Sequence, residues 1–133
     1  MSSNILNTVE KIRPLIQLHT SESLWGDVDK ANQSYQAYTL EICKAFSDGY
    51  GISLSEALAA DHEPALQSVG AFYLLPYETS YAIRILKRLS KSDHIEVSVN
   101  ASSILAEWRK QTLQFPRLAG QGVVYFTASE LPL

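Results

Sequence analysis

The stretch DVDKANQSYQAYTLEICKAFSDGYG, residues 27–51, has the clearest helical pattern in the chain. Its apolar and aromatic side chains recur at steps of three or four residues, which places them on one face of an α-helix. These residues are Val28, Ala31, Tyr35, Tyr38, Ile42, Ala45 and Phe46. Asp27 or Asp29 can cap the start of the helix, and Gly49 and Gly51 are expected to end it. The stretch therefore predicts a long amphipathic helix.

Helical patterns also occur on both sides of this stretch. Residues 5–16 carry an apolar stripe that contains Pro14, so a kink or a restart is expected there. Ser53 with Glu56, and Asp93 with Glu96, have the spacing of a capping box. Further helices are expected over residues 53–61, 64–75, 78–90 and 93–108. The helix over residues 64–75 has a proline in its first turn, and the proline that follows it is expected to end it. The sequence thus predicts an all-α fold.

The C-terminal tail, residues 118–133, has a different period. Its run VVYFT, residues 123–127, is β-branched and aromatic and has strand character. We expect an extended arm packed on the helices; a strand that pairs across a dimer and a misread helix are the alternatives. Because 133 residues fit one domain and no linker composition occurs, residues 1–133 are expected to form a single helical domain with this arm.

A weak internal repeat is visible. The dipeptide Asp-His occurs at residues 61–62 and 93–94, one 32-residue period apart, and similar apolar or small residues follow each copy. This pattern predicts a repeated helix start that is capped by aspartate. The run KSDHIEVSVNASSILAEW, residues 91–108, resembles the second helix of a short HEAT-like repeat, with Asp93, Val97, Ala101 and Leu105 at the usual spacing. The resemblance implies stacked helical hairpins, a fragment of an α-solenoid; an irregular helical bundle is the alternative.

Charge is unevenly distributed along the chain, whose net charge is −3. Residues 20–78 contain nine acidic and two basic residues, whereas residues 79–117 contain seven basic and three acidic ones. Such asymmetry indicates a charged partner. The single cysteine excludes an intrachain disulfide, and neither a membrane-spanning run nor a secretory signal is found. We therefore expect a cytoplasmic protein without a membrane partner.

The sequence contains no P-loop, nucleophile elbow, HExxH pair or EF-hand loop. We therefore expect a non-enzymatic protein without a cofactor or a metal site. One alternative is a small metal-dependent enzyme, because His62 and His94 would lie at equivalent helix starts with acidic neighbours. Cys43 follows a position of the apolar face, so we expect a buried thiol rather than a nucleophile.

Two further segments can contact a partner. A basic stripe at helical spacing, which can follow a row of phosphates, makes nucleic-acid binding another alternative; it consists of Arg84, Lys87, Arg88 and Lys91. Because the protein as a whole is acidic, with a pI of about 5.5, a solvated surface is the simpler interpretation. The aromatic run FYLLPYETSY, residues 72–81, is expected to be a packed corner, with a tyrosine-rich interface as the alternative.

In size, acidity and helical character the chain resembles the small acidic helical immunity proteins with which bacteria neutralise toxins. This resemblance implies stoichiometric binding of a basic, nuclease-type toxin, whose encounter would be accelerated by an acidic surface. The sequence leaves the oligomeric state open. The expected contacts are acidic residues that gather at helix starts: Glu56, Asp61 and Glu63 first, then Glu22, Asp27 and Asp29.

Overall fold

The computed structural model describes residues 3–131, which form six α-helices, a two-stranded antiparallel hairpin and a short 3-10 helix. The elements are α1 (Ser3–Glu22), α2 (Val28–Ser47), α3 (Gly51–Ala59), α4 (Pro64–Leu74), α5 (Thr79–Leu89), α6 (Ile95–Arg109), β1 (Gln114–Ala119), β2 (Gly122–Thr127) and η1 (Ala128–Glu130). The predicted all-α fold with a short extended C-terminal segment is confirmed. None of the helices in this part of the chain combines the length and apolar character that a bilayer span needs.

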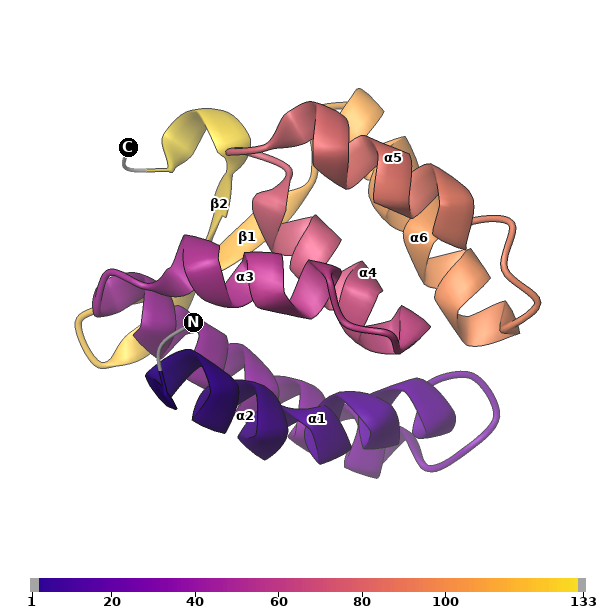
Figure 1. Ribbon diagram of the computed structural model, residues 1–133, viewed down its shortest axis with the longest axis horizontal. Helices are drawn as coiled ribbons and strands as arrows, with labels where there is room; N and C mark the ends of the chain where they lie inside the picture. The colour runs from indigo at the N-terminus through magenta and orange to yellow at the C-terminus, as the bar shows by residue number, and fades with distance from the viewer. Residues whose placement is uncertain (1–2, 132–133) are drawn as a thin grey trace.

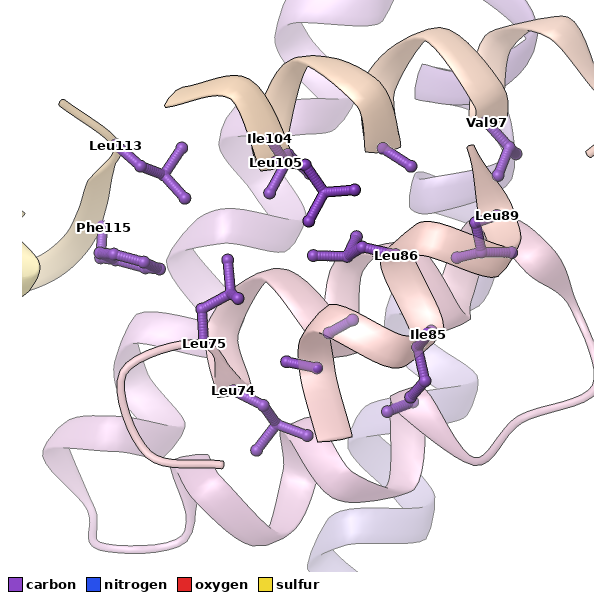
Figure 2. Close-up of a cluster of buried hydrophobic side chains, with 14 of the residues drawn as sticks. Leu74, Leu75, Ile85, Leu86, Leu89, Val97, Ile104, Leu105, Leu113 and Phe115 are labelled. Carbon is purple, nitrogen blue, oxygen red and sulfur yellow. The ribbon is translucent and has the colours of Figure 1, made fainter. Parts of the chain in front are cut away.

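Helices that follow each other in the chain pack as neighbours (Figure 1). α1 and α2 lie side by side along one edge of the molecule, α3 and α4 come next, and α5 and α6 lie beyond them. One group of buried side chains, the N-terminal cluster, joins α1, α2, α3 and α4. A second group, the C-terminal cluster, joins α4, α5, α6 and the hairpin (Figure 2). α4 contributes to both, with Leu66 and Tyr73 in the first and Leu74 in the second.

Local sequence explains both ends of α2. The Asp27 side chain accepts hydrogen bonds from the backbone N–H groups of Asp29 and Lys30, so Asp27 is the cap. After the helix ends, Gly49 adopts a positive φ of 92°, which favours glycine. Gly51, which was expected to end α2, instead begins α3. α1 continues through Pro14, so the predicted restart is wrong.

Neither predicted capping box forms. α3 begins two residues before Ser53, α6 begins two residues after Asp93, and neither start has a side-chain cap hydrogen bond. At the start of α6 the Ser92 hydroxyl oxygen instead accepts a hydrogen bond from the backbone N–H of His94. The capping-box spacing by itself therefore did not locate the first turn of α3 or of α6.

The prediction that each copy of the repeat begins a helix capped by aspartate is also wrong. Glu63 occupies the N-cap position of α4 without a side-chain cap bond, and Asp61 accepts the backbone N–H of Glu63 ahead of the helix. Pro64 lies in the first turn of α4, as expected. The two copies of the repeat begin their helices differently, and the HEAT-like resemblance itself stays a prediction.

The C-terminal segment is extended, as expected, but it is a regular hairpin. β1 pairs with β2, so that Gln114 lies opposite Thr127 and Ala119 lies opposite Gly122. Residues 123–127 therefore form a strand whose partner, β1, lies in the same chain. The expectations of an irregular arm, of a strand that pairs across a dimer and of a misread helix are wrong.

β1 is largely buried although it contains a proline and an arginine. Phe115 is fully buried in the C-terminal cluster. Arg117 is only 8% exposed; its guanidinium carbon lies 3.8 Å from the centroid of the Phe46 ring, and it donates to the Tyr77 hydroxyl over 2.9 Å. A buried charge is costly unless such contacts satisfy it. They fix the hairpin to α2 and to the α4–α5 corner.

Candidate functional site

A cleft of about 510 Å³ lies between two walls, one from α1 and α2 and the other from α6. α4 contributes Ser68, Val69 and Phe72 between these walls. The hairpin lines one end of the cleft with Gln114 and Tyr125. A volume of this order accommodates a small ligand or a few side chains of a partner.

Three rings from α1 and α2 pack together in one wall of the cleft. The centroid of the His19 ring lies 5.5 Å from that of Tyr35 and 5.9 Å from that of Tyr38, and the two tyrosine rings are 5.5 Å apart. His19 Nδ1 donates to the carbonyl of Ala31 over 3.0 Å, which fixes the imidazole. The wall is therefore ordered before any ligand binds.

The tyrosine hydroxyls at this wall remain neutral over the physiological pH range. The hydroxyl oxygens of Tyr35 and Tyr125 are 3.4 Å apart, which joins α2 to β2. Burial raises the pKa of Tyr35 and of Tyr38 well above the usual range. Both side chains are thus available as hydrogen-bonding groups rather than as charges.

The fixed charges of the cleft are negative. Among the described residues that line it, Glu96 and Glu107 carry carboxylates and none is a lysine or an arginine. Neither carboxylate has an ion-pair partner among residues 3–131. An acidic cleft without internal cations favours a cationic ligand.

Apolar side chains are exposed at the edge of the cleft. Leu24 and Val99 line it from opposite walls and are 40% and 47% exposed. Next to Leu24, in the connection between α1 and α2, Trp25 is 81% exposed. Tryptophan is among the residues that contribute most to protein-protein binding energy.

None of the six acidic residues predicted as contacts lines this cleft. Asp27 caps α2, and the Glu22 carboxylate accepts the backbone N–H of Asp27 over 2.6 Å. Asp29 is exposed in the first turn of α2. Glu56 lies beside Glu78, and its carboxyl group raises the pKa of Glu78.

The remaining two predicted contacts, Asp61 and Glu63, are neutralised by an arginine of α1. Arg13 Nη2 lies 2.8 Å from Asp61 Oδ1, and Arg13 Nη1 lies 2.6 Å from Glu63 Oε1. The Arg13 guanidinium lowers the pKa of Asp61, whereas the Gln17 amide and Arg13 together lower the pKa of Glu63. These acids hold α1 against the start of α4.

We expect Arg13→Ala to reduce the free energy of unfolding by about 2 kcal/mol, between the values for exposed and buried ion pairs. Because the folded-state pKa values of Asp61 and Glu63 are lowered, their contribution is present above the unfolded pKa of about 4 and is lost as the pH falls below it. Urea denaturation at neutral and acidic pH measures both effects.

Lys11→Ala provides the control for Arg13→Ala, because the Lys11 ion pair with Glu41 is exposed. Its expected loss is below about 1 kcal/mol. A similar loss for the two variants, or a difference between parent and Arg13→Ala that persists at acidic pH, would contradict the role given to Arg13.

The predicted histidine site is not assembled as expected. The ligand atoms of Asp61, His62 and Glu63 lie within 4.8 Å of one another, but the Arg13 guanidinium already engages both carboxylates. His94 is not part of this group and is exposed at the start of α6.

Cys43 is fully buried, and burial raises the pKa of its thiol to about 11, which agrees with a structural thiol.

Of the other two predicted contact segments, the basic stripe lies outside the cleft, whereas the aromatic run contributes Phe72 and Tyr73 to its lining. The basic residues of the stripe are exposed; Arg88 donates to the Gln67 side chain over 3.1 Å, and Lys91 lies beyond the end of α5. The aromatic run 72–81 is mainly a packed corner, since Tyr73 is buried and the Phe72 ring stacks on Phe115 with centroids 4.8 Å apart.

Sequence reasoning missed Glu96, Glu107, Asn100 and Tyr125 as a group. They come from α6 and β2, and they meet Tyr35 and Tyr38 only after the hairpin packs on α2. No local spacing in the sequence indicates that these residues come together.

Comparison with protein-family models, curated proteins and solved structures found no match to the chain.

Proposed function

We propose that the protein is a non-enzymatic binding module that holds a basic, partly apolar segment of another protein in the cleft. The observation that carries this proposal is the pair of unpaired carboxylates, Glu96 and Glu107, in a cleft lined by no lysine or arginine of the described chain. Opposite charges across an interface raise the association rate and reject partners of the wrong sign.

The exposed apolar edge supports a protein partner rather than a small ion. Leu24, Trp25 and Val99 offer contact area for side chains that flank the basic group. Aromatic and aliphatic anchors of this kind supply most of the free energy of binding at protein interfaces.

Toxin immunity is the narrower form of the same proposal. A nuclease-type toxin presents basic residues where it binds nucleic acid, and the acidic cleft complements them in charge. Co-expression with the product of a neighbouring gene tests this form, since immunity requires a one-to-one complex and loss of toxicity.

We expect peptides selected from a random phage-displayed library on the immobilised protein to combine arginine or lysine with aromatic or branched aliphatic residues. Glu96→Lys with Glu107→Lys should weaken a selected peptide by at least about tenfold, and rising salt should weaken binding to the parent. Fluorescence anisotropy of the labelled peptide measures both.

Asp29→Lys with Glu56→Lys is the matched control, because it makes the same charge change outside the cleft. Its binding should stay within about twofold of the parent, apart from the long-range effect of net charge at low salt. Selected peptides without basic residues, or equal losses in the two double variants, would exclude the cleft as the site.

A further inference from the structure

α6 presents a straight row of polar side chains to the cleft. Its members follow one another at steps of four, three and four residues, which keeps them on one face of an α-helix. All of them line the cleft, and together they are the α6 row: Glu96, Asn100, Ser103 and Glu107. In the middle of the row, Asn100 Nδ2 donates to Ser68 Oγ over 3.1 Å, which holds α6 against α4.

The two carboxylates of the α6 row are separate anionic positions. Glu96 and Glu107 are eleven residues apart, which corresponds to about 16 Å along the helix axis. One cationic side chain cannot contact both carboxylates across that distance. The row therefore carries a negative charge at each end, with an amide and a hydroxyl between them, and it complements two cations rather than one.

Glu107 is unfavourably placed for the stability of α6 itself. It lies in the last turn, where the partial negative charge of the helix end opposes a carboxylate. Thr112 Oγ1 donates to the backbone carbonyl of Glu107, and the carboxylate has no ion pair within residues 3–131. Glu96, by contrast, lies in the first turn and suits the helix dipole. A cation bound at the Glu107 end would offset the unfavourable charge.

The walls of the cleft favour a helical occupant. Most of its lining comes from α1, α2, α4 and α6, and the backbone groups inside a helix are already paired with one another. Such walls cannot bond to the backbone of an extended segment, which is bound at the edge of a sheet. A helix satisfies its own backbone and needs only side-chain contacts with a groove.

The two ends of the α6 row have different neighbours. Val99 lies about one turn after Glu96, is exposed and lines the cleft. Thr112 and Gln114, which are polar, line the cleft beyond Glu107. An occupant that fits both ends therefore places apolar side chains beside one of its basic groups and polar side chains beside the other.

We propose that the cleft binds an amphipathic helix of another protein, which lies along α6 and carries two basic residues about three turns apart. The proposal rests on the proposed binding function and specifies the conformation and the charge spacing of the basic segment. Positions i and i+11 of a helix share a face and are about 16 Å apart, so they match Glu96 and Glu107. Apolar residues between them would contact Val69 and Phe72, which are half-buried in α4.

A second copy of this chain does not provide such a helix. Within residues 3–131, no helix has two basic residues eleven positions apart. The ends of the basic stripe, Arg84 and Lys91, are only seven positions apart. α5 also buries its apolar side chains in the C-terminal cluster, so they are not available to a partner. The charge spacing therefore fits a different protein.

The test uses three fluorescently labelled, alanine-rich peptides of eighteen residues with leucines on one face. The matched peptide has lysines at positions i and i+11, and the shifted peptide has the second lysine at i+6, on another side of the helix. The third is the matched peptide with a central proline, which breaks the helix. The matched peptide should bind the full chain with a Kd at least about fivefold below those of the other two.

Two further measurements locate the matched peptide and its conformation. In the 15N-labelled full chain it should shift the amide signals of Asn100, Ser103 and Gln114. Circular dichroism should show that its helix content rises on binding, because a free helix of this length is only marginally stable.

Charge variants of the protein test the two ends of the α6 row separately. Glu96→Gln and Glu107→Gln should each weaken the matched peptide by about threefold to tenfold, since each removes one charge pair. The double variant should bind the matched and the shifted peptide equally. Glu56→Gln is the control, because Glu56 lies outside the cleft, and it should preserve the preference.

The outcomes separate this inference from the proposed function. Equal binding of the matched peptide and either of the other two would overturn the helical occupant, and so would a matched peptide that shifts no signal in the cleft. The basic-segment function would still stand if a phage-selected peptide shifts those signals. Absence of shifts in the cleft with the phage-selected peptides as well would overturn both.

Discussion

Phe115→Ala is expected to lower the free energy of unfolding by about 3–5 kcal/mol, the usual cost of removing a fully buried phenylalanine side chain. Phe115 is 0% exposed, its ring stacks on Phe72, and it meets the Trp108 ring edge-on with centroids 6.3 Å apart. The substitution would leave a cavity where β1, α4 and α6 meet. Urea denaturation followed by far-UV circular dichroism measures the loss.

Phe126→Ala is the matched control, because Phe126 lies directly opposite Phe115 in the hairpin but is only partly buried. Its expected loss is about 1–2 kcal/mol, since less apolar surface is withdrawn from water. If both variants lost the same amount, Phe115 would not be the residue that fixes the hairpin to the core.

Gly70→Ala is expected to lower the free energy of unfolding by about 2–3 kcal/mol, although alanine is the better helix former. A Cβ atom at position 70 would collide with backbone atoms of Ser55 and Ala59 in α3. Backbone cannot swing aside as a side chain can, so α3 and α4 would have to separate. Thermal and urea denaturation measure the change.

Gly122→Ala is the control for Gly70, because a Cβ atom there meets no heavy atom within 4 Å. Its stability should stay within about 0.5 kcal/mol of the parent. A loss at Gly122 as large as that at Gly70 would show that the effect comes from the glycine backbone and not from the contact between α3 and α4.

The helical part of the fold could be predicted from the sequence because its signals are periodic and repeated. The apolar face of α2, the proline at the start of α4 and the amphipathic pattern of α5 each identify a helix that the structure contains. The capping boxes failed because a pattern of two residues is short, and the start of α3 is set instead by the turn at Gly49.

β1 and the cleft could not be predicted because both depend on contacts between distant residues. The sequence QFPRLA does not alternate, and Arg117 is buried only because Phe46 and Tyr77 meet its guanidinium. Asp61 and Glu63 looked like free surface acids, since their partner Arg13 lies about 50 residues earlier in the chain. Charge along the sequence therefore did not show which carboxylates are unpaired.

The sharing of α4 by two buried clusters has a consequence for cooperativity. Ile16 and Tyr73 of the N-terminal cluster and Val97 and Ile104 of the C-terminal cluster all line the cleft, which therefore lies along the seam between them. We therefore expect the two sides to open separately in the free protein, so that hydrogen exchange would report different opening free energies for α1 and α6. A segment bound across the seam contacts both sides, so it would join them into one unfolding unit.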